Sequence, residues 1–414
     1  MRFRFQLRWL AVGIFLVAGT INFLDRQLLA AVAPSLKAEL HLTNAQYGGL
    51  ISAYSAVYAI VAPGVGLFVD RVGLNAGMSL AVFIWSIAGV ATGFSSTFRG
   101  LLACRMGLAV GESTGNSGPG KATAMYLDPG ELAIAGGFGA TSITLGTMAA
   151  PLVAAALAPH YGWRSVFILC GGLGFLWIPL WWFTARRIPP RVESVTAPSI
   201  PLGTLLRDRR LWGVTLAYAL VYCLYSLWAN WTTVYFVHER HLTQLEANQH
   251  FAWFPPAFAI VGGFFGGGLA FRLIRRGMGG MEARMRACWL TAPMLLATAA
   301  VPIIPSSAMA AVAIGVSFLC LQSLICNIHV LPVDLYGAPR AAFTNSLSSS
   351  ASYTLQALIS PLIGWVVDRF GFGPVCVIAS VLPLLGLWAL QVSLSAKGSQ
   401  KLVHHPGVLG SIPP

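Results

Sequence analysis

Apolar stretches of about 20 residues follow one another along almost the whole chain, and each is long enough to cross a bilayer as a helix. Only 9% of the residues are charged, whereas soluble domains carry about 25%. Helices satisfy their own backbone hydrogen bonds inside a membrane. The sequence therefore predicts an all-α integral membrane protein. Twelve spans are expected, over residues 9–36, 44–69, 74–97, 99–127, 131–158, 163–185, 210–237, 245–273, 285–304, 307–334, 341–367 and 372–395.

A polar interval rich in Pro, Ser and Arg divides these spans into two groups of six. Weak repeats support two related halves, because the Pro-Leu stretch that begins at Pro151 returns at Pro361. Internal repeats in a membrane protein are typical of transporters, whose substrate sites lie between the repeats near the bilayer midplane. The predicted units are an N-terminal six-helix bundle over residues 1–186, a cytoplasmic linker over 187–209, a C-terminal six-helix bundle over 210–396, and a tail over 397–414 that we expect to be disordered.

The net charge of +13 is explained by the placement of the basic residues. If the N-terminus is cytoplasmic, 19 Lys and Arg in the loops and near the ends of the spans fall on that side and 5 on the other. Cytoplasmic loops of membrane proteins are enriched in Lys and Arg. We therefore expect a multi-pass protein of the cytoplasmic (inner) membrane with both termini cytoplasmic, and no nucleic-acid partner. The first apolar segment has no small-residue cleavage site and is interpreted as a retained helix.

Charged residues deep inside two of the spans are the main candidates for function. Asp25 and Arg26 lie in "TINFLDRQLLAAVAP", and Arg105 and Glu112 lie in "LLACRMGLAVGESTGNSGPG". Seven residues make about two helical turns, so Arg105 and Glu112 share one helix face. Adjacent residues point about 100° apart, so one of Asp25 and Arg26 should face a cavity and the other a neighbouring helix. A structural ion-pair network is the alternative, but buried pairs return little stability, which favours a functional role.

Several motifs together resemble the major facilitator superfamily and, within it, the anion:cation symporter family that includes bacterial sugar-acid transporters. The motifs are "INFLDRQLLAAVAPSLKAELHLTNAQYGGLISAYSAVYAI", "GLFVDRVG", "CRMGLAVGES" and "YGWRSVF". The resemblance covers about residues 9 to 395. It implies two six-helix halves that work by alternating access, and proton-coupled symport of an organic anion such as a sugar acid.

The resemblance also assigns roles to particular residues. It implies that Asp25 and Glu112 respond to protons, that Arg105 holds the substrate carboxylate, and that Arg26 belongs to the charged network. Tyr58 is implied to lie in the site. The remaining candidates for substrate binding are Tyr54, Tyr225, Trp228, Tyr235, Ser350 and Thr354, the last two standing where the family often offers amides, and the gating candidates are Asp70 and Arg71.

The four membrane charges also suggest how a proton and an anion are coupled. Fully ionised, Asp25 and Glu112 cancel Arg26 and Arg105. Protonation of either acid leaves a net positive charge in a dry cavity, where an organic anion gains most. The expected partners are therefore a small organic anion, protons and the lipid bilayer, with the protein acting as a monomer, and no metal or other cofactor is expected.

Two other functional classes remain open at this stage. An exchanger or uniporter of another small solute has the same architecture, although a site with two Arg residues disfavours cations. A membrane enzyme or receptor is the other alternative, but no His-rich cluster or nucleophile motif lies at membrane depth. The sequence does not identify the anion, because aromatic residues in a site suit sugar acids, aromatic acids and small aliphatic carboxylates.

Overall fold

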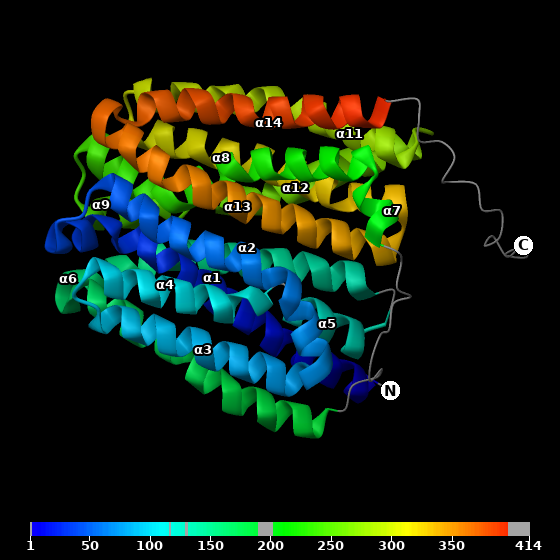
Figure 1. The fold of residues 1–414 in the computed structure, drawn as a ribbon, viewed down its shortest axis with the longest axis horizontal. Coiled ribbons are helices and arrows are strands. Elements are labelled where there is room, and N and C mark those ends of the chain that lie inside the picture. Colours follow the sequence, from blue (N-terminus) through cyan, green and yellow to red (C-terminus); the bar gives the residue numbers. More distant parts are fainter. Residues whose placement is uncertain (1, 116, 129–130, 189–201, 396–414) are drawn as a thin grey trace, which may run out of the picture.

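The computed structural model describes residues 2–115, 117–128, 131–188 and 202–395. Its helices run along the long axis of the molecule, with the N-terminal half below the C-terminal half in Figure 1. The start of the first helix and the end of the last lie at the same end of the bundle, called here the termini end. The opposite end is called the distal end. Most of the predicted linker, and the tail expected to be disordered, lie outside the described residues.

The N-terminal half is built from long helices joined by short turns. Its elements are α1 (Arg2–Leu40), α2 (Asn44–Val72), α3 (Leu74–Phe94), α4 (Phe98–Glu112), the 3-10 turn η1 (Ser113–Gly115), α5 (Ser117–Tyr126) and α6 (Leu132–Arg187).

The C-terminal half has more interruptions. Its elements are α7 (Leu202–Leu206), α8 (Arg209–Arg240), α9 (Gln244–Glu246), the π-helical turn η3 (Ala247–Ala252), α10 (Ala257–Arg275), α11 (Gly280–Thr291), the 3-10 segment η4 (Ala292–Ile303), α12 (Ser307–Tyr336), α13 (Ala338–Phe370) and α14 (Phe372–Ser395).

Ten helical stretches among the described residues are long and apolar enough to cross a membrane. One of them, Ile134–Arg187, is 54 residues long and contains Gly162 at a φ of 76°, where one helix ends and the next begins. It therefore makes two crossings. The segments α4, η1 and α5 together make one more. The expected all-α bundle of twelve membrane helices in two halves is confirmed.

The span predicted over residues 99–127 is not one continuous helix, because it breaks directly after Glu112. The Ser113 hydroxyl donates to the carbonyl of Val110 at 2.7 Å, and the Thr114 hydroxyl donates to that of Gly111 at 2.9 Å. Hydroxyl groups that bond to nearby carbonyls offer the backbone an alternative to the α-helical pattern. The α-helix therefore ends at Glu112, one of the charged residues that the sequence analysis selected.

Two predicted spans of the C-terminal half are also interrupted. The span over 245–273 begins with the end of α9, continues as a π-helical turn and then breaks before α10, where Pro255 and Pro256 supply no backbone N–H. The span over 285–304 begins earlier, at Gly280, and its second part is 3-10 helix that starts with Ala292 and Pro293. Proline at that position cannot donate the α-helical hydrogen bond.

The two halves repeat one turn in detail. The sequence "HLT" occurs at His41 and again at His241, and both histidines adopt left-handed backbone conformations with φ values of 51° and 54°. Each is followed by a threonine that caps the next helix in a capping box, Thr43 before α2 and Thr243 before α9. The same hairpin is therefore built at the distal end of each half.

Two pairs of helices lie side by side where the halves meet, and α10 and the η3 turn of the C-terminal half also pack against α6. The helix α13 lies along α2, and α8 lies along α1. Within the N-terminal half, α1 packs along α6, so it contacts both its own half and the opposite one. A charged residue in the middle of α1 therefore lies where both halves can respond to it.

Candidate functional site

Charged side chains from the middle of the N-terminal half form one buried cluster. Asp25 and Arg26 come from α1, and Arg105 and Glu112 come from α4. Each of these residues exposes 7% of its surface or less, and Glu112 exposes none. Ionisable groups inside membrane helices are expensive and typically mark functional sites.

Glu112 is held by partners that reach it from α1 and α2. Arg26 Nε donates to Glu112 Oε2 at 2.9 Å, and the Tyr54 hydroxyl donates to the same oxygen at 2.6 Å. The other oxygen, Oε1, is buried and has no hydrogen-bond partner among the described residues. Glu112 thus has one oxygen that fixes it to α1 and α2 and one that is available to a proton or a donor.

Arg26 is engaged through all three of its nitrogen atoms. Besides the bond to Glu112, Nη1 donates to the Tyr353 hydroxyl at 2.8 Å and Nη2 donates to Asn22 Oδ1 at 3.2 Å. The guanidinium also lies 4.5 Å from the centroid of the Phe23 ring. Tyr353 belongs to α13, so Arg26 connects the cluster to the C-terminal half.

Arg105 is placed differently, because two of its donors are unused. Its guanidinium lies 4.8 Å from the centroid of the Tyr54 ring. Its Nε and Nη1 atoms are buried and have no hydrogen-bond partner within the described ranges. A planar guanidinium with free donors is well suited to a carboxylate, which it can hold through two parallel hydrogen bonds.

Asp25 lies on the side of the cluster that faces its own half. It lies near Glu112 and Arg105, and near Cys170 of α6. Neither of its oxygens has a hydrogen-bond partner in the described part of the chain. The adjacent side chains of Asp25 and Arg26 therefore diverge, with Arg26 directed to the interface between the halves.

Tyrosine rings surround the cluster and continue across the interface. The rings of Tyr58 and Tyr353 have centroids 4.1 Å apart, and those of Tyr353 and Tyr222 are 5.5 Å apart. The Tyr222 hydroxyl also donates to the Tyr353 hydroxyl at 3.3 Å. Further rings of α8 stack on Tyr222, those of Tyr218 and Tyr225. These rings form a continuous aromatic wall from α2 through α13 to α8.

The remaining residues predicted to bind the substrate lie at different distances from the charged cluster. Trp228 lines a small cavity between the halves, and the buried Ser350 Oγ has no partner among the described residues. Tyr235 lies near the distal end, where its hydroxyl donates to the carbonyl of Val301 at 2.9 Å. Thr354 is exposed and donates to the carbonyl of Ser350 at 2.9 Å. Tyr235 and Thr354 are therefore not brought to the charged cluster.

Three residues of the site were not predicted from the sequence. Asn22 lies one helical turn before Arg26, a spacing that could have indicated a shared face. Tyr353 directly precedes the predicted Thr354, on the neighbouring face of α13. Tyr222 has only the tyrosine-rich "YALVYCLY" as a signal.

The predicted gating residues lie at the termini end of α2. Arg71 is exposed at the termini end of α2, and the side chain of Asp70 lies outside the described part of the structure. The described residues contain no group of three or more His, Cys, Asp and Glu side chains that could hold a metal ion.

A bundle of membrane helices in two related halves, with a buried charged site where they meet, defines the class as a secondary membrane transporter. A family model described as Major Facilitator Superfamily matches residues 15–353. The chain belongs to this family. The protein is thus a multi-pass membrane transporter and not an enzyme.

Curated relatives at low identity span nearly the same length. The hexuronate transporter of Escherichia coli (strain K12) is 26% identical, over 94% of this chain and 95% of that protein. The probable L-galactonate transporter of the same strain is 25% identical, over 88% and 84%. The probable sulfoacetate transporter of Cupriavidus necator is 25% identical, over 90% of both proteins.

A solved structure shares the fold. The bacterial homologue of the human lysosomal transporter Spinster, in an inward-facing and unoccupied conformation, superimposes with a TM-score of 0.72. It is 20% identical, and the match covers 94% of this chain and 95% of that one.

Proposed function

We propose that the protein is a proton-coupled symporter that carries a small organic anion, such as a sugar acid or another carboxylate, by alternating access. The observation that carries the proposal is Arg105, a buried guanidinium with two unused donors beside two carboxylic acids. The names of the relatives support the substrate class, because hexuronate, L-galactonate and sulfoacetate are all organic anions.

The charge and the planar shape of the Arg105 guanidinium determine how the anion binds. Its carboxylate accepts hydrogen bonds from the free donors of Arg105, in a buried site where such bonds are stronger than in water. Arg26 is the less suitable anchor, because Glu112, Tyr353 and Asn22 already occupy its nitrogens. The Tyr54 ring beside Arg105 stacks on Tyr58, and the aromatic wall that continues from there packs against the rest of the substrate.

Proton and anion assist each other at this site. An anion on Arg105 lies close to Glu112 and Asp25, and like charges repel strongly in a low-dielectric interior. A proton on either acid removes that repulsion and strengthens anion binding. Linkage requires the reverse effect to be equally large, so the bound anion strengthens proton binding.

The charged cluster is also connected to the C-terminal half by hydrogen bonds. Glu112 holds Arg26, and Arg26 holds Tyr353 of α13. A proton or substrate that changes the partners of Glu112 changes the position of Arg26 and therefore its bond to the C-terminal half. This chain of contacts links occupancy of the site to the relative position of the two halves.

We place the termini end of the bundle in the cytoplasm and the protein in the cytoplasmic (inner) membrane as a monomer. The basis for the orientation is the excess of Lys and Arg that the sequence predicts on the side of the N-terminus, 19 against 5. The distal end then faces outward. Asp70 and Arg71, at the termini end of α2, are assigned to the cytoplasmic gate because of the resemblance to the family.

Uptake into proteoliposomes tests the proposal. The purified protein is supplied with labelled hexuronate, galactonate, sulfoacetate or a neutral sugar, with and without an inward proton gradient. We expect one class of anion to accumulate above its external concentration only with the gradient, and a protonophore to abolish the accumulation. Equal uptake with and without the gradient would instead identify a uniporter or exchanger, and uptake of the neutral sugar alone would overturn the anion site.

A further inference from the structure

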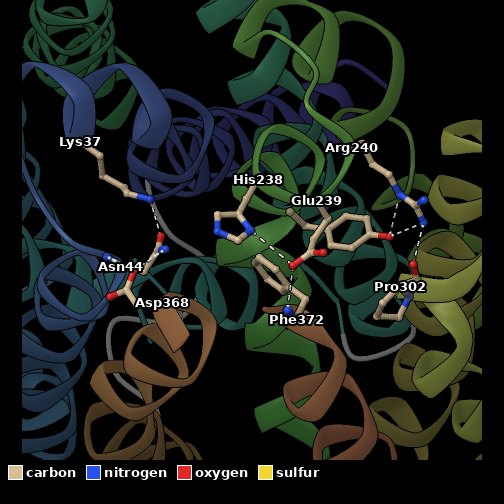
Figure 2. A network of polar contacts seen from close by, with 9 residues as sticks. Lys37, Asn44, His238, Glu239, Arg240, Pro302, Asp368 and Phe372 are labelled. Carbon is tan, nitrogen blue, oxygen red and sulfur yellow. Dashed lines mark hydrogen bonds and ion pairs between the residues drawn. The ribbon is translucent and has the colours of Figure 1, made fainter. Parts of the chain in front are cut away.

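The distal end of the molecule holds a contact between the halves that the charged cluster does not explain. Asp368, near the end of α13, reaches the first turn of α2 in the opposite half. Its Oδ1 accepts from the backbone N–H of Asn44 at 3.1 Å and from Asn44 Nδ2 at 2.7 Å, and its Oδ2 accepts from the backbone N–H of Ala45 at 3.1 Å. Figure 2 shows Asp368 beside Asn44, with Lys37 of α1 bonded to the Asn44 side chain.

The contact completes a helix cap across the interface. The first N–H groups of a helix have no partners within the helix, and that end carries a partial positive charge. The side chain of Thr43, the N-cap residue of α2, accepts from the N–H of Gln46. The two preceding N–H groups, those of Asn44 and Ala45, are taken by a carboxylate from the other half.

The backbones are closest at the same place. A Cβ atom added to Gly48 of α2 would overlap the backbone of Ser360 in α13, and one added to Gly364 would overlap the backbone of Asn44. The two helices are therefore in direct backbone contact beside Asp368. They cannot separate at the distal end while the carboxylate stays on the first turn of α2.

The sequence around Asp368 repeats a motif from the opposite end of the bundle. Residues 364–371 read "GWVVDRFG", and residues 66–73 at the termini end of α2 read "GLFVDRVG". Both motifs end in a glycine with positive φ, 71° at Gly371 and 87° at Gly73. The helices α2 and α13 lie side by side, and each carries an Asp-Arg pair at its own C-terminal end.

The fold itself does not require an acid at this position. In the N-terminal half the corresponding helix of the repeat ends at Gly162, which also has positive φ, but the preceding residues "APHY" supply no carboxylate. The acid is therefore specific to the pair formed by α13 and α2.

We propose that Asp368 is the latch residue that closes the distal side of the transport pathway, by capping α2 from the opposite half. When Asp368 caps α2, this contact seals the route from the distal end to the charged cluster. Its release is a required step whenever the site opens on that side. The proposal needs only the alternation between two open states and is independent of the identity of the substrate.

Thiol labelling without substrate or proton gradient tests the latch separately from the proposed symport. Ala30 is buried and lines the small cavity between the halves, one turn beyond Arg26 toward the distal end. A cysteine at Ala30 is labelled by a membrane-impermeant maleimide in intact cells and in inside-out vesicles, so that the distal side is identified by experiment. The native chain with its seven cysteines gives the background rate.

In the Ala30→Cys background, we expect Asp368→Asn to raise the labelling rate from the distal side about fivefold, which corresponds to about 1 kcal/mol. The neutral amide loses the attraction to the helix end, and the closed state becomes less populated. Glu239→Gln is the matched control, because Glu239 also places a carboxylate on a helix N-terminus at the distal end. It accepts from the N–H of Phe372 at 2.9 Å, entirely within the C-terminal half (Figure 2).

An unchanged rate in Asp368→Asn, or an equal rise in Glu239→Gln, would overturn the proposal. Asn44→Ala provides a second test from the other half, since it removes one of the three donors to Asp368. We expect it to raise the rate in the same direction by about twofold, because one neutral donor contributes less than the whole charged contact. This variant decides the question if Asp368→Asn fails to fold, and an unchanged rate in it would then count against the latch.

Discussion

The two guanidinium groups of the cluster are surrounded so differently that they cannot share one task. Arg26 has a partner on each nitrogen, including one from each half of the molecule. Arg105 lies beside the Tyr54 ring with two donors unused among the described residues. A buried donor without a partner is costly, so it is kept where a ligand satisfies it. We therefore propose Arg105 as the anchor for the anion and Arg26 as the structural link between the halves.

Arg105→Ala should reduce substrate affinity by about 100-fold while the protein stays folded and monodisperse in detergent, because it removes two charge-assisted hydrogen bonds. Arg105→Lys should also bind poorly, since an ammonium group cannot replace the planar fork. The measurement is binding of the transported anion by calorimetry. Arg99→Ala is the control, because Arg99 is an exposed residue of the same helix. A Lys variant with native affinity would move the carboxylate contact to Arg26.

Glu112→Gln should lose accumulation driven by a proton gradient but keep exchange of labelled for unlabelled substrate. The amide resembles the protonated acid in size and hydrogen bonding but cannot release a proton. Net uptake requires the empty transporter to return after the proton leaves, whereas exchange never uses that step. Uptake and counterflow at equal pH are measured in the same vesicles. Accumulation at the native level would remove Glu112 from the proton path, and loss of both activities would make it a structural or substrate residue.

The sequence identified the four charged residues of the cluster but not their pairing. Their rarity inside apolar spans was sufficient to select Asp25, Arg26, Arg105 and Glu112. Which acid meets which base depends on how α1 and α4 are rotated against each other, and periodicity does not contain that information. Tyr353 was missed for the same reason, since its role depends on how α13 of the other half lies against α1.

A small residue of α6, Gly146, allows the helix α1 to pack close to α6. A Cβ atom at Gly146 of α6 would overlap the carbonyl oxygen of Thr20 and would lie 2.9 Å from the backbone nitrogen of Leu24, one residue before the charged pair. Small residues allow such close approach of membrane helices. The packing of α6 therefore fixes the position of α1 just before the cluster begins.

Gly146→Val should destabilise the protein by about 1–3 kcal/mol, because overpacking forces α6 away from α1. We expect a lower midpoint of thermal unfolding in detergent and a parallel loss of transport. Gly139→Val, in the same helix, is the matched control, since no heavy atom lies within 4 Å of a Cβ built at Gly139. Equal midpoints for the two variants would show that α6 and α1 can separate without cost.

The lengths and order of the membrane helices followed from hydrophobic spans, but their interruptions did not. The break after Glu112 depends on hydroxyl groups that bond to the carbonyls of Val110 and Gly111, and Ser and Thr also occur inside uninterrupted helices. Gly162 was a better signal, because the predicted spans 131–158 and 163–185 are separated there. The π-helical turn before α10 positions Asn248 against the Ala31 carbonyl of the other half, at 2.8 Å, and hydropathy does not register such a contact.

Among the described residues, hydrogen bonds join the halves at the middle and at the distal end of the bundle. Tyr47 donates to the carbonyl of Asn230 at 2.6 Å, and the Asn248 amide donates to that of Ala31 at 2.8 Å. These bonds lie beyond the cluster toward the distal end, and Arg26 with Tyr353 lies at the middle. The repeat of two halves could be predicted from the sequence. The side on which the halves close could not be predicted from the sequence, because it depends on individual hydrogen bonds.

Tyr353→Phe should slow transport about tenfold while changing the KM for the anion by less than about twofold, given the usual strength of a hydrogen bond to a charged group. The variant keeps the ring against Tyr58 but removes the hydroxyl that joins Arg26 to the C-terminal half, and Arg105 still binds the anion. Initial rates of uptake over a range of substrate concentrations separate the two parameters. Tyr222→Phe is the control, because it removes only the bond from Tyr222 to the Tyr353 hydroxyl and leaves the contact with Arg26 in place. An increase in KM at unchanged maximal rate would make Tyr353 a substrate contact, and a native rate would show that the halves respond to the cluster by another route.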